Sequence, residues 1–314
     1  MDTLYLVVPC YNEEEVLPET SKRLREKMNS LISAGKISPE SRVMLVNDGS
    51  KDRTWELIEA LHGADKLFSG VCLSRNRGHQ NALLAGLMTA KEKADMVISM
   101  DADLQDDIGA IDEMIDKYHD GCDIVYGVRS ARDTDTAFKR GTAGSFYKLI
   151  NRMGGQVVDN HADYRLMSRR ALEALSDYGE VNLFLRGIVP MIGYKTDIVY
   201  YERGERFAGE SKYPLKKMLA FAADGVTSLT LYPLRAIFFA GCALCALALA
   251  LLVVFIISAC FGNSLLSWRL VLVAVVLMGG LNLTALGVIG EYIGKIGFEV
   301  KHRPRYIISK VIDE

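Results

Sequence analysis

Residues 96–106 read MVISMDADLQD, an apolar run that ends in two aspartates one residue apart. The run has the length of a strand and lacks alternating polar side chains, which is typical of strands buried on both faces of a mainly parallel sheet. We therefore expect a strand over Met96–Asp101. Similar apolar runs occur elsewhere in the first 130 residues, at Leu4–Pro9, Val43–Asn47, Gly70–Leu73 and Asp123–Val128.

Longer amphipathic segments separate these runs and predict helices at about Val16–Ala34, Asp52–Leu61, His79–Lys93 and Ile108–His119. Strands that alternate with helices in this way favour a doubly wound α/β domain. Asp163–Ser168 and Lys195–Tyr201 predict two further strands, so the domain is expected to occupy residues 1–212. Ligands of such domains bind beyond the carboxyl ends of the strands.

The overall composition excludes several classes of protein. The chain has 314 residues, of which 50% are hydrophobic and 24% charged, and a net charge of −2. This composition argues against a disordered chain and against a dedicated nucleic-acid binder. Asp2 and the acidic residues at 13–15 argue against a secretory signal. The three cysteines before residue 130 show no spacing typical of a zinc site or a disulfide scaffold, and the C-x-x-C at 242–245 lies inside a long apolar run.

A membrane hairpin is predicted near the C-terminus. Residues 236–290 contain one charged side chain, Arg269, and divide into apolar runs at 236–261 and 270–290, each long enough to cross a bilayer. We expect an amphipathic interface segment at 213–234, a hairpin at 235–293 and a cytosolic tail at 294–314. Basic residues flank the hairpin, which predicts a multi-pass protein of the cytoplasmic membrane with both ends in the cytoplasm. They are Lys212, Lys216, Lys217, Arg235, Lys295, Lys301, Arg303, Arg305 and Lys310.

The acidic residues after the fourth strand could hold a metal ion. Because side chains alternate along a strand, Asp101, Asp103 and Gln105 are predicted to project to the same side. Their oxygen atoms suit Mg²⁺ or Mn²⁺, which commonly bridge protein oxygens and a substrate diphosphate. The alternative is a loop that caps the next helix, a position for which Asp106 and Asp107 are better placed.

Polar residues also follow the first two strands, at Pro9-Cys-Tyr11-Asn-Glu13 and Asn47-Asp48-Gly-Ser50. Glu13 or Asp48 could hydrogen-bond a ribose or a base edge, and Tyr11 could pack on a ring. Asn12, Ser50 and Asp52 are expected to cap helices. No glycine-rich dinucleotide motif follows the first strand, and no P-loop motif occurs in the chain.

These segments, in this order, resemble glycosyltransferase family 2, whose catalytic domain has the GT-A fold. The resemblance covers nearly the whole chain, and with a C-terminal hairpin it extends to the polyprenyl-phosphate glycosyltransferases. One departure is the sequence Asn160-His161-Ala162, which leaves the role of His161 open. The matching segments are VVPCYNEE (7–14), VNDGSKDRT (46–54), LSRNRGHQNAL (73–83), DADLQD (101–106), GVRSARD (127–133), ADYRLMSRRAL (162–172) and RFAGESKYPL (206–215).

The resemblance implies that a hexose, most simply from UDP-glucose, is transferred with inversion to undecaprenyl or another polyprenyl phosphate. It implies that Asp103 and Gln105 hold the metal ion, with Asp101 near the nucleotide and the metal, and that Arg206 lies near the diphosphate. Arg129 and Arg140 match the acceptor-phosphate region, where guanidinium groups suit phosphate oxygens. Asp163 matches an acidic position near the reaction centre and would be a base or an orienting group, with Arg165 as its structural partner.

Several alternatives stay open. The donor could instead be GDP-mannose, UDP-GlcNAc or a UDP-aminoarabinose derivative, and the chain could be a catalytically silent, membrane-anchored scaffold that binds nucleotide sugars. A processive polysaccharide synthase is disfavoured, because neither Trp55 nor Trp268 completes the Q-x-x-R-W motif of those enzymes. Relatives with this hairpin are often oligomeric, which implies a homo-oligomer such as a tetramer.

Overall fold

The computed structural model describes residues 1–130, 161–180, 183–202, 204, isolated positions between 234 and 250, and 268–313. The chain divides into two compact units. The first comprises Met1–Ala222 together with Arg303–Glu314, and the second comprises Ala223–His302. The first unit therefore takes in the whole predicted catalytic domain and the last part of the predicted tail, from Arg303 onward.

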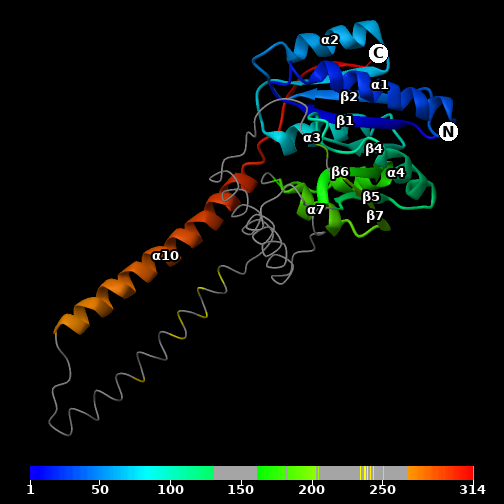
Figure 1. Ribbon diagram of the computed structural model, residues 1–314. Helices are drawn as coiled ribbons and strands as arrows, with labels where there is room; N and C mark the ends of the chain where they lie inside the picture. Colours follow the sequence, from blue (N-terminus) through cyan, green and yellow to red (C-terminus); the bar gives the residue numbers. More distant parts are fainter. Residues whose placement is uncertain are drawn as a thin grey trace. The chain divides into compact units, whose positions relative to one another are not determined.

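The first unit contains an eight-stranded sheet in the order β7-β5-β6-β4-β1-β2-β3-β8 (Figure 1). All the strands predicted from the sequence form, with small shifts at their ends. The strands are β1 (Leu4–Cys10), β2 (Arg42–Asn47), β3 (Phe68–Leu73), β4 (Met96–Ser99), β5 (Ile124–Arg129), β6 (His161–Ser168), β7 (Thr196–Tyr201) and β8 (Ile308–Ile312).

The sheet is mixed, and its two antiparallel strands were not predicted as such. Neighbours β4, β1, β2 and β3 pair in parallel, as do β5 and β7. Strand β6 runs antiparallel between β4 and β5, and β8 runs antiparallel beside β3. The carboxyl ends of β1, β2, β3, β4, β5 and β7 consequently meet at one edge of the sheet, and β6 begins there.

Helices cover both faces of the sheet, which explains the uninterrupted apolar strands. Alternate residues of β1 enter different cores: Leu6 and Val8 pack under α1, α2 and α4, whereas Tyr5 and Val7 pack under α3, α6 and α7. Each strand thus buries both of its faces. The helices are α1 (Leu17–Ser33), α2 (Thr54–Ala64), α3 (His79–Ala90), α4 (Ala110–His119), α6 (Arg169–Ser176) and α7 (Leu185–Met191).

A glycine allows α3 to lie close against the sheet. A Cβ atom on Gly86 would lie 2.4 Å from Val7 Cγ1 and 2.6 Å from Val46 Cγ2. Only a residue without a side chain fits at this contact. Because His79 begins α3, the close approach at Gly86 helps to set where the first turn of the helix lies at the carboxyl edge.

Strand β8, which the sequence analysis did not predict, returns the tail to the sheet beside β3 (Figure 1). Ser74, which follows β3, donates its N–H to the Ile307 carbonyl at 2.9 Å. Ion pairs from Lys310 to Glu59 at 2.6 Å and from Lys93 to Asp313 at 2.7 Å add to the docking of the tail. Backbone and side-chain contacts therefore both fix the register of β8 against β3.

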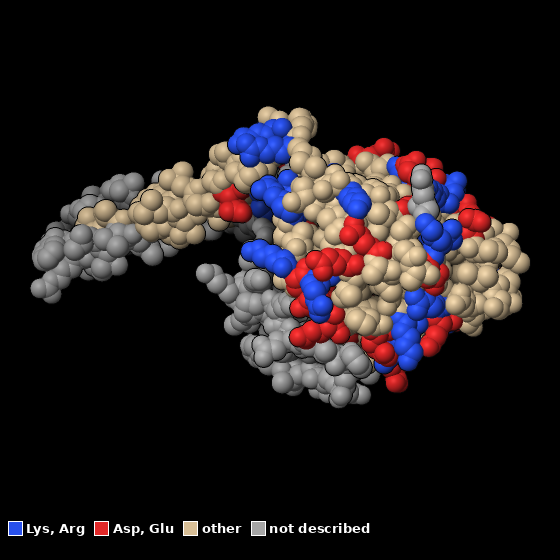
Figure 2. All heavy atoms as spheres, turned by 90° about the horizontal axis from the view of Figure 1, so that it is seen from above, with Lys and Arg blue, Asp and Glu red and all other residues tan. Residues whose placement is uncertain are grey.

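The second unit contains the helix α10 (Trp268–Val300), which includes the second apolar run. Its exposed side chains include large apolar residues such as Val275, Leu283 and Leu286. Figure 2 shows few charged side chains along its described length, whereas both signs of charge mix on the visible face of the first unit. Within the part of the chain that the structure describes, no helix has both the length and the hydropathy needed to cross a membrane. The interface segment at 213–234 and the run at 236–261 lie almost wholly outside the described residues.

Candidate active site

Acidic residues gather at the carboxyl edge of the sheet, after β4. The strand ends at Ser99, so the expectation that Asp101, Asp103 and Gln105 share one strand face was wrong. The chain turns instead, with Leu104 at a φ of 58°, and Asp103 Oδ1 accepts the Gln105 N–H at 3.2 Å. The turn, not strand alternation, places these residues at the edge.

Burial and neighbouring carboxylates raise the pKa values of two aspartates in this turn. Burial raises the pKa of Asp101, and His79 opposes this shift, while Asp163 and Asp103 raise the pKa further. Burial and the charge of Asp101 likewise raise the pKa of Asp106 to about 6. Carboxylates that raise each other's pKa in this way would be stabilised by a positive ligand.

Asp163, near the start of β6, is held by two arginines. Its Oδ1 accepts from Arg165 Nη2 at 2.9 Å and from Arg186 Nε at 3.3 Å, and its Oδ2 accepts from Arg186 Nη2 at 3.0 Å. Burial alone would raise the pKa of Asp163, but Arg186, His79 and Arg165 hold it well below its usual range. The carboxylate is therefore ionised, with both oxygens occupied.

His79, the first residue of α3, lies between two of these carboxylates. Its Nε2 is 3.5 Å from Asp101 Oδ1 and 3.6 Å from Asp163 Oδ2. Burial lowers the pKa of His79, but the nearby carboxylates of Asp163 and Asp101 outweigh burial and raise the pKa to about 9. The imidazole is thus a cation at neutral pH and links the two acidic positions.

The loop that delivers His79 depends on Asp48. The two oxygens of Asp48 accept the N–H groups of Arg77 at 2.7 Å and Gly78 at 2.9 Å. The next residue, Gly49, has a φ of +63° and passes so close to the backbone of Arg75 that a Cβ would lie 2.5 Å from its carbonyl carbon. Asp48, predicted to contact the nucleotide, is buried and holds this loop.

Arg129, at the end of β5, is part of a second network. Its Nε donates to the Tyr201 hydroxyl at 3.3 Å, and its Nη2 lies 3.7 Å from Asp106 Oδ1. Tyr201, at the end of β7, donates its O–H to Asp106 Oδ1 at 2.6 Å. The Arg129 side chain is 25% exposed, and its guanidinium group is held by Tyr201 and Asp106.

The ends of β1 and β2 are tied to each other. Asn12 donates its N–H to Ser50 Oγ at 3.0 Å, and its own Oδ1 accepts the Lys51 N–H at 2.9 Å. Asn12 and Ser50 therefore link two loops and do not cap helices, whereas Asp52 Oδ1 accepts the Thr54 N–H at the start of α2. Pro9 is buried within β1, Tyr11 is half-buried, and Glu13 helps to line a pocket of about 410 Å³.

The structure brings Asp101, Asp103, Asp163 and Arg129 to one edge of the sheet. Arg140 and Arg206 lie outside the described residues, as does the side chain of His161. The sequence analysis assigned no role to His79 and did not identify Arg186 or Tyr201. It expected Asp106 at a helix cap and not in contact with Tyr201. His79 did lie within a matched segment, 73–83, but no local pattern marked Arg186 or Tyr201.

The donor set after β4 suits a hard divalent cation. Asp101 and Asp103 supply carboxylate oxygens and Gln105 an amide oxygen, which are the ligands that Mg²⁺ and Mn²⁺ prefer. Among the residues that the structure describes, no three His, Cys, Asp or Glu side chains gather closely enough to enclose a metal by themselves. The residues present fit an ion that a diphosphate would help to hold.

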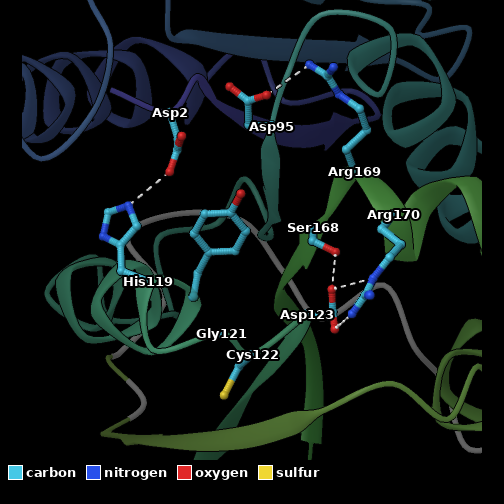
Figure 3. Close-up of a pocket in the computed structure, with 10 residues that line it drawn as sticks. Asp2, Asp95, His119, Gly121, Cys122, Asp123, Ser168, Arg169 and Arg170 are labelled. Atoms are coloured by element: carbon cyan, nitrogen blue, oxygen red, sulfur yellow. Dashed lines mark hydrogen bonds and ion pairs between the residues drawn. The ribbon is translucent and has the colours of Figure 1, made fainter.

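A different pocket, of about 480 Å³, opens at the opposite edge of the sheet (Figure 3). Its charged side chains are paired with one another. Figure 3 shows Arg170 and Ser168 directed at Asp123, His119 at Asp2 and Arg169 at Asp95, the last two at 3.1 Å. Because these side chains already pair with one another, we assign them to the stability of the fold and not to ligand binding.

The mixed sheet covered on both faces, with an acidic turn at its carboxyl edge, is a GT-A-like fold. The chain belongs to the family described as glycosyl transferase family 2, whose model matches residues 5–176. The prediction of this family is confirmed, and the protein is a glycosyltransferase.

Relatives match over almost the whole chain. The uncharacterized glycosyltransferase YkoT of Bacillus subtilis is 52% identical over 98% of this chain and 91% of its own length. The SfII prophage-derived bactoprenol glucosyl transferase of Shigella flexneri is 41% identical over 97% of each chain. Among solved structures, glucosyl-3-phosphoglycerate synthase from Mycobacterium tuberculosis is 17% identical, with a TM-score of 0.47 over 73% of this chain and 78% of that chain.

Proposed function

We propose that the protein transfers a glucosyl group from UDP-glucose to undecaprenyl phosphate or another polyprenyl phosphate, with inversion at the anomeric carbon. The observation that carries this proposal is the 41% identity, over 97% of each chain, to a protein named as a bactoprenol glucosyl transferase. Similarity over both full lengths means that the regions outside the family model, 177–314, are shared as well.

The acidic turn supports a role in donor binding. Asp101, Asp103 and Gln105 would hold Mg²⁺ or Mn²⁺, which when bound supplies positive charge that stabilises the departing nucleoside diphosphate. Burial raises the pKa of Asp101, and the neighbouring carboxylates of Asp163 and Asp103 raise it further, which supports a bound cation at this turn. We expect the nucleotide near the ends of β1 and β2, with Pro9, Tyr11 and Glu13 nearby and Arg206 near the diphosphate.

Arg129 is the described residue that best suits the acceptor. A phosphate monoester is already largely anionic at neutral pH, so it needs positioning and charge neutralisation more than a base. Tyr201 and Asp106 hold the Arg129 guanidinium in place at the carboxyl edge. We assign Arg129, together with Arg140, to the acceptor phosphate, and Asp163 to orientation of the site.

A membrane location follows from the acceptor, because each CH₂ of a lipid tail moved into water costs about 0.8 kcal/mol. We propose that runs 236–261 and 270–290 form a hairpin, with the segment 213–234 at the interface and both ends in the cytoplasm. The support is the single charged residue, Arg269, across 236–290 and the basic residues on either side. The apolar side chains that α10 exposes fit a lipid environment or a homo-oligomer such as a tetramer.

The donor can be identified by comparing three nucleotide sugars. Membranes that contain the protein are incubated with radiolabelled UDP-glucose, GDP-mannose or UDP-GlcNAc, and the lipid fraction is extracted and counted. We expect label in the lipid from UDP-glucose and little from the others. Label from GDP-mannose or UDP-GlcNAc alone would contradict the donor assignment, and no label from any donor would support a silent scaffold.

A further inference from the structure

Two helices begin beside Asp163 and are connected to each other. Gln80, in the first turn of α3, accepts the N–H of Leu185 through its Oε1 at 2.9 Å. Leu185 begins α7, where backbone N–H groups lack partners within the helix, so the Gln80 side chain satisfies one of them. The start of α7 is thereby fixed relative to the start of α3.

The residues next to this contact both reach Asp163. Arg186 follows Leu185 and places its guanidinium along the carboxylate, with Nε 3.3 Å from Oδ1 and Nη2 3.0 Å from Oδ2. His79 precedes Gln80 and lies 3.6 Å from Oδ2. A change in the Gln80–Leu185 contact would therefore move both cations that flank the carboxylate.

Asp163 has little freedom in this arrangement. Its side chain is 10% exposed, and the second arginine, Arg165, is 1% exposed and occupies Oδ1 from within the core. A bidentate contact between a guanidinium and a carboxylate group fixes the orientation of the carboxylate and also stabilises its negative charge. The fixed carboxylate in turn holds the His79 ring 3.5 Å from Asp101, on the side of the acidic turn.

We propose that Gln80 and Arg186 are positioning residues that hold Asp163 as a fixed anion, and that sugar transfer depends on this geometry and not on proton acceptance by Asp163. The inference rests on the proposed transfer to a phosphate, an acceptor that is already anionic and needs no strong base. Gln80 acts through the start of α7, and Arg186 acts through direct contact with Asp163.

The Gln80 contact is tested with a conservative pair and a matched control. Gln80→Ala removes the acceptor of the Leu185 N–H, whereas Gln80→Glu keeps an oxygen at the same place. Thr89→Ala removes a different hydrogen bond of α3, from Thr89 Oγ1 to the Ala85 carbonyl at 2.8 Å, away from α7. We expect kcat to fall about 3- to 10-fold in Gln80→Ala, to recover in Gln80→Glu and to be unchanged in Thr89→Ala.

Arg186 is tested by separating kcat from KM. Arg186→Ala should lower kcat about 100-fold, because displacement of a positioned group by about 1 Å has effects of this size, while KM for each substrate changes less than about 2-fold. Arg186→Lys should recover only part of the loss, since an ammonium group cannot form the two-pronged contact. A rise in KM for one substrate that accounts for the loss would mean that Arg186 binds that substrate, and would overturn the positioning role.

Hydrogen exchange tests the contact without relying on activity. Exchange at the Leu185 amide should accelerate in Gln80→Ala and stay protected in Gln80→Glu and Thr89→Ala. Unchanged exchange in Gln80→Ala, or equal losses of kcat in Gln80→Ala and Thr89→Ala, would overturn the proposal. A wild-type protein that transfers no sugar would contradict the proposed function instead, while the exchange data would still decide whether the contact holds α7.

Discussion

The Asp163 carboxylate and the Arg186 guanidinium lie side by side, with 3.0 Å between Oδ2 and Nη2 and 3.3 Å between Oδ1 and Nε. Asp163 lies in β6 and Arg186 in α7, and the two residues are 23 positions apart in the sequence. The contact is largely buried, so it contributes to the stability of the fold as well as to the geometry of the site.

Replacement of Asp163 by asparagine should destabilise the protein. The change removes the negative charge that the buried Arg165 and the partly buried Arg186 contact, and removal of one member of a buried pair costs about 3–5 kcal/mol. Urea unfolding of the wild type and of Asp163→Asn would measure the difference. A loss below about 1 kcal/mol would contradict the structural importance of this contact.

The pKa of Asp163 predicts how the difference in unfolding free energy between wild type and Asp163→Asn changes with pH. Because the folded pKa of Asp163 lies well below its usual range, its stabilising contribution is present above an unfolded pKa of about 3.9 and is lost as pH falls through the folded pKa. The difference in unfolding free energy between wild type and Asp163→Asn should be flat between about pH 5 and 6. On the acid side it should shrink only below about pH 5, whereas a decrease already between pH 6 and pH 5 would indicate a raised Asp163 pKa.

Two glycine substitutions test the packing of α3 on the sheet. Gly86→Ala should destabilise the protein by about 1–3 kcal/mol, because the added Cβ would overlap Val7 and Val46. Gly63→Ala in α2 is the matched control, since nothing lies within 4 Å of its added Cβ. That control should stabilise the helix by up to about 1 kcal/mol. Equal effects in thermal unfolding would contradict the close approach of α3.

Replacement of Arg129 should reduce use of the lipid acceptor. Arg129→Ala removes a charge-assisted contact of about 1.5–3 kcal/mol, which corresponds to a loss of about 10- to 150-fold in kcat/KM for the polyprenyl phosphate. Tyr201→Phe should cause a smaller loss, because it removes only the hydroxyl that anchors the guanidinium. Nucleotide titration serves as the control: weaker nucleotide binding with normal acceptor use would place Arg129 at the donor site.

Cysteine labelling tests the predicted topology. In a background with the native cysteines replaced by alanine, Ser264→Cys should react with an impermeant thiol reagent in intact cells. Lys310→Cys should react only after the membrane is permeabilised, and this position suits labelling because the Lys310 side chain is 56% exposed. Labelling of Lys310→Cys alone in intact cells would reverse the proposed orientation.

The sequence predicted the parts of the fold that depend on local pattern. The apolar runs located the central strands because both of their faces are buried, and the residues after them reach the expected edge. Strand β8 was not predicted. It lies at a sheet edge and exposes most of its side chains, so its sequence has no apolar run. The nucleotide role of Asp48 stays a prediction, and the chain pattern could not show that its oxygens also accept the backbone N–H groups of Arg77 and Gly78.

The rest of the site depends on contacts between distant segments. Arg186 comes to Asp163 only because β6 lies antiparallel between β4 and β5 and α7 begins beside α3. Tyr201 reaches Arg129 because β5 and β7 are neighbours, with these two residues directly paired in register. No spacing of residues within either segment predicts such contacts.

The most direct test of the proposed reaction uses purified protein, UDP-glucose, undecaprenyl phosphate and Mg²⁺ or Mn²⁺, with the lipid product measured by mass spectrometry. The account predicts a polyprenyl phosphate heavier by one hexose. It also predicts that product formation is abolished by EDTA and nearly abolished in Asp103→Asn, while that variant keeps the unfolding temperature of the wild type. Full activity of Asp103→Asn, or undiminished product in EDTA, would contradict the metal-assisted account, and no hexose on the lipid would contradict the transfer itself.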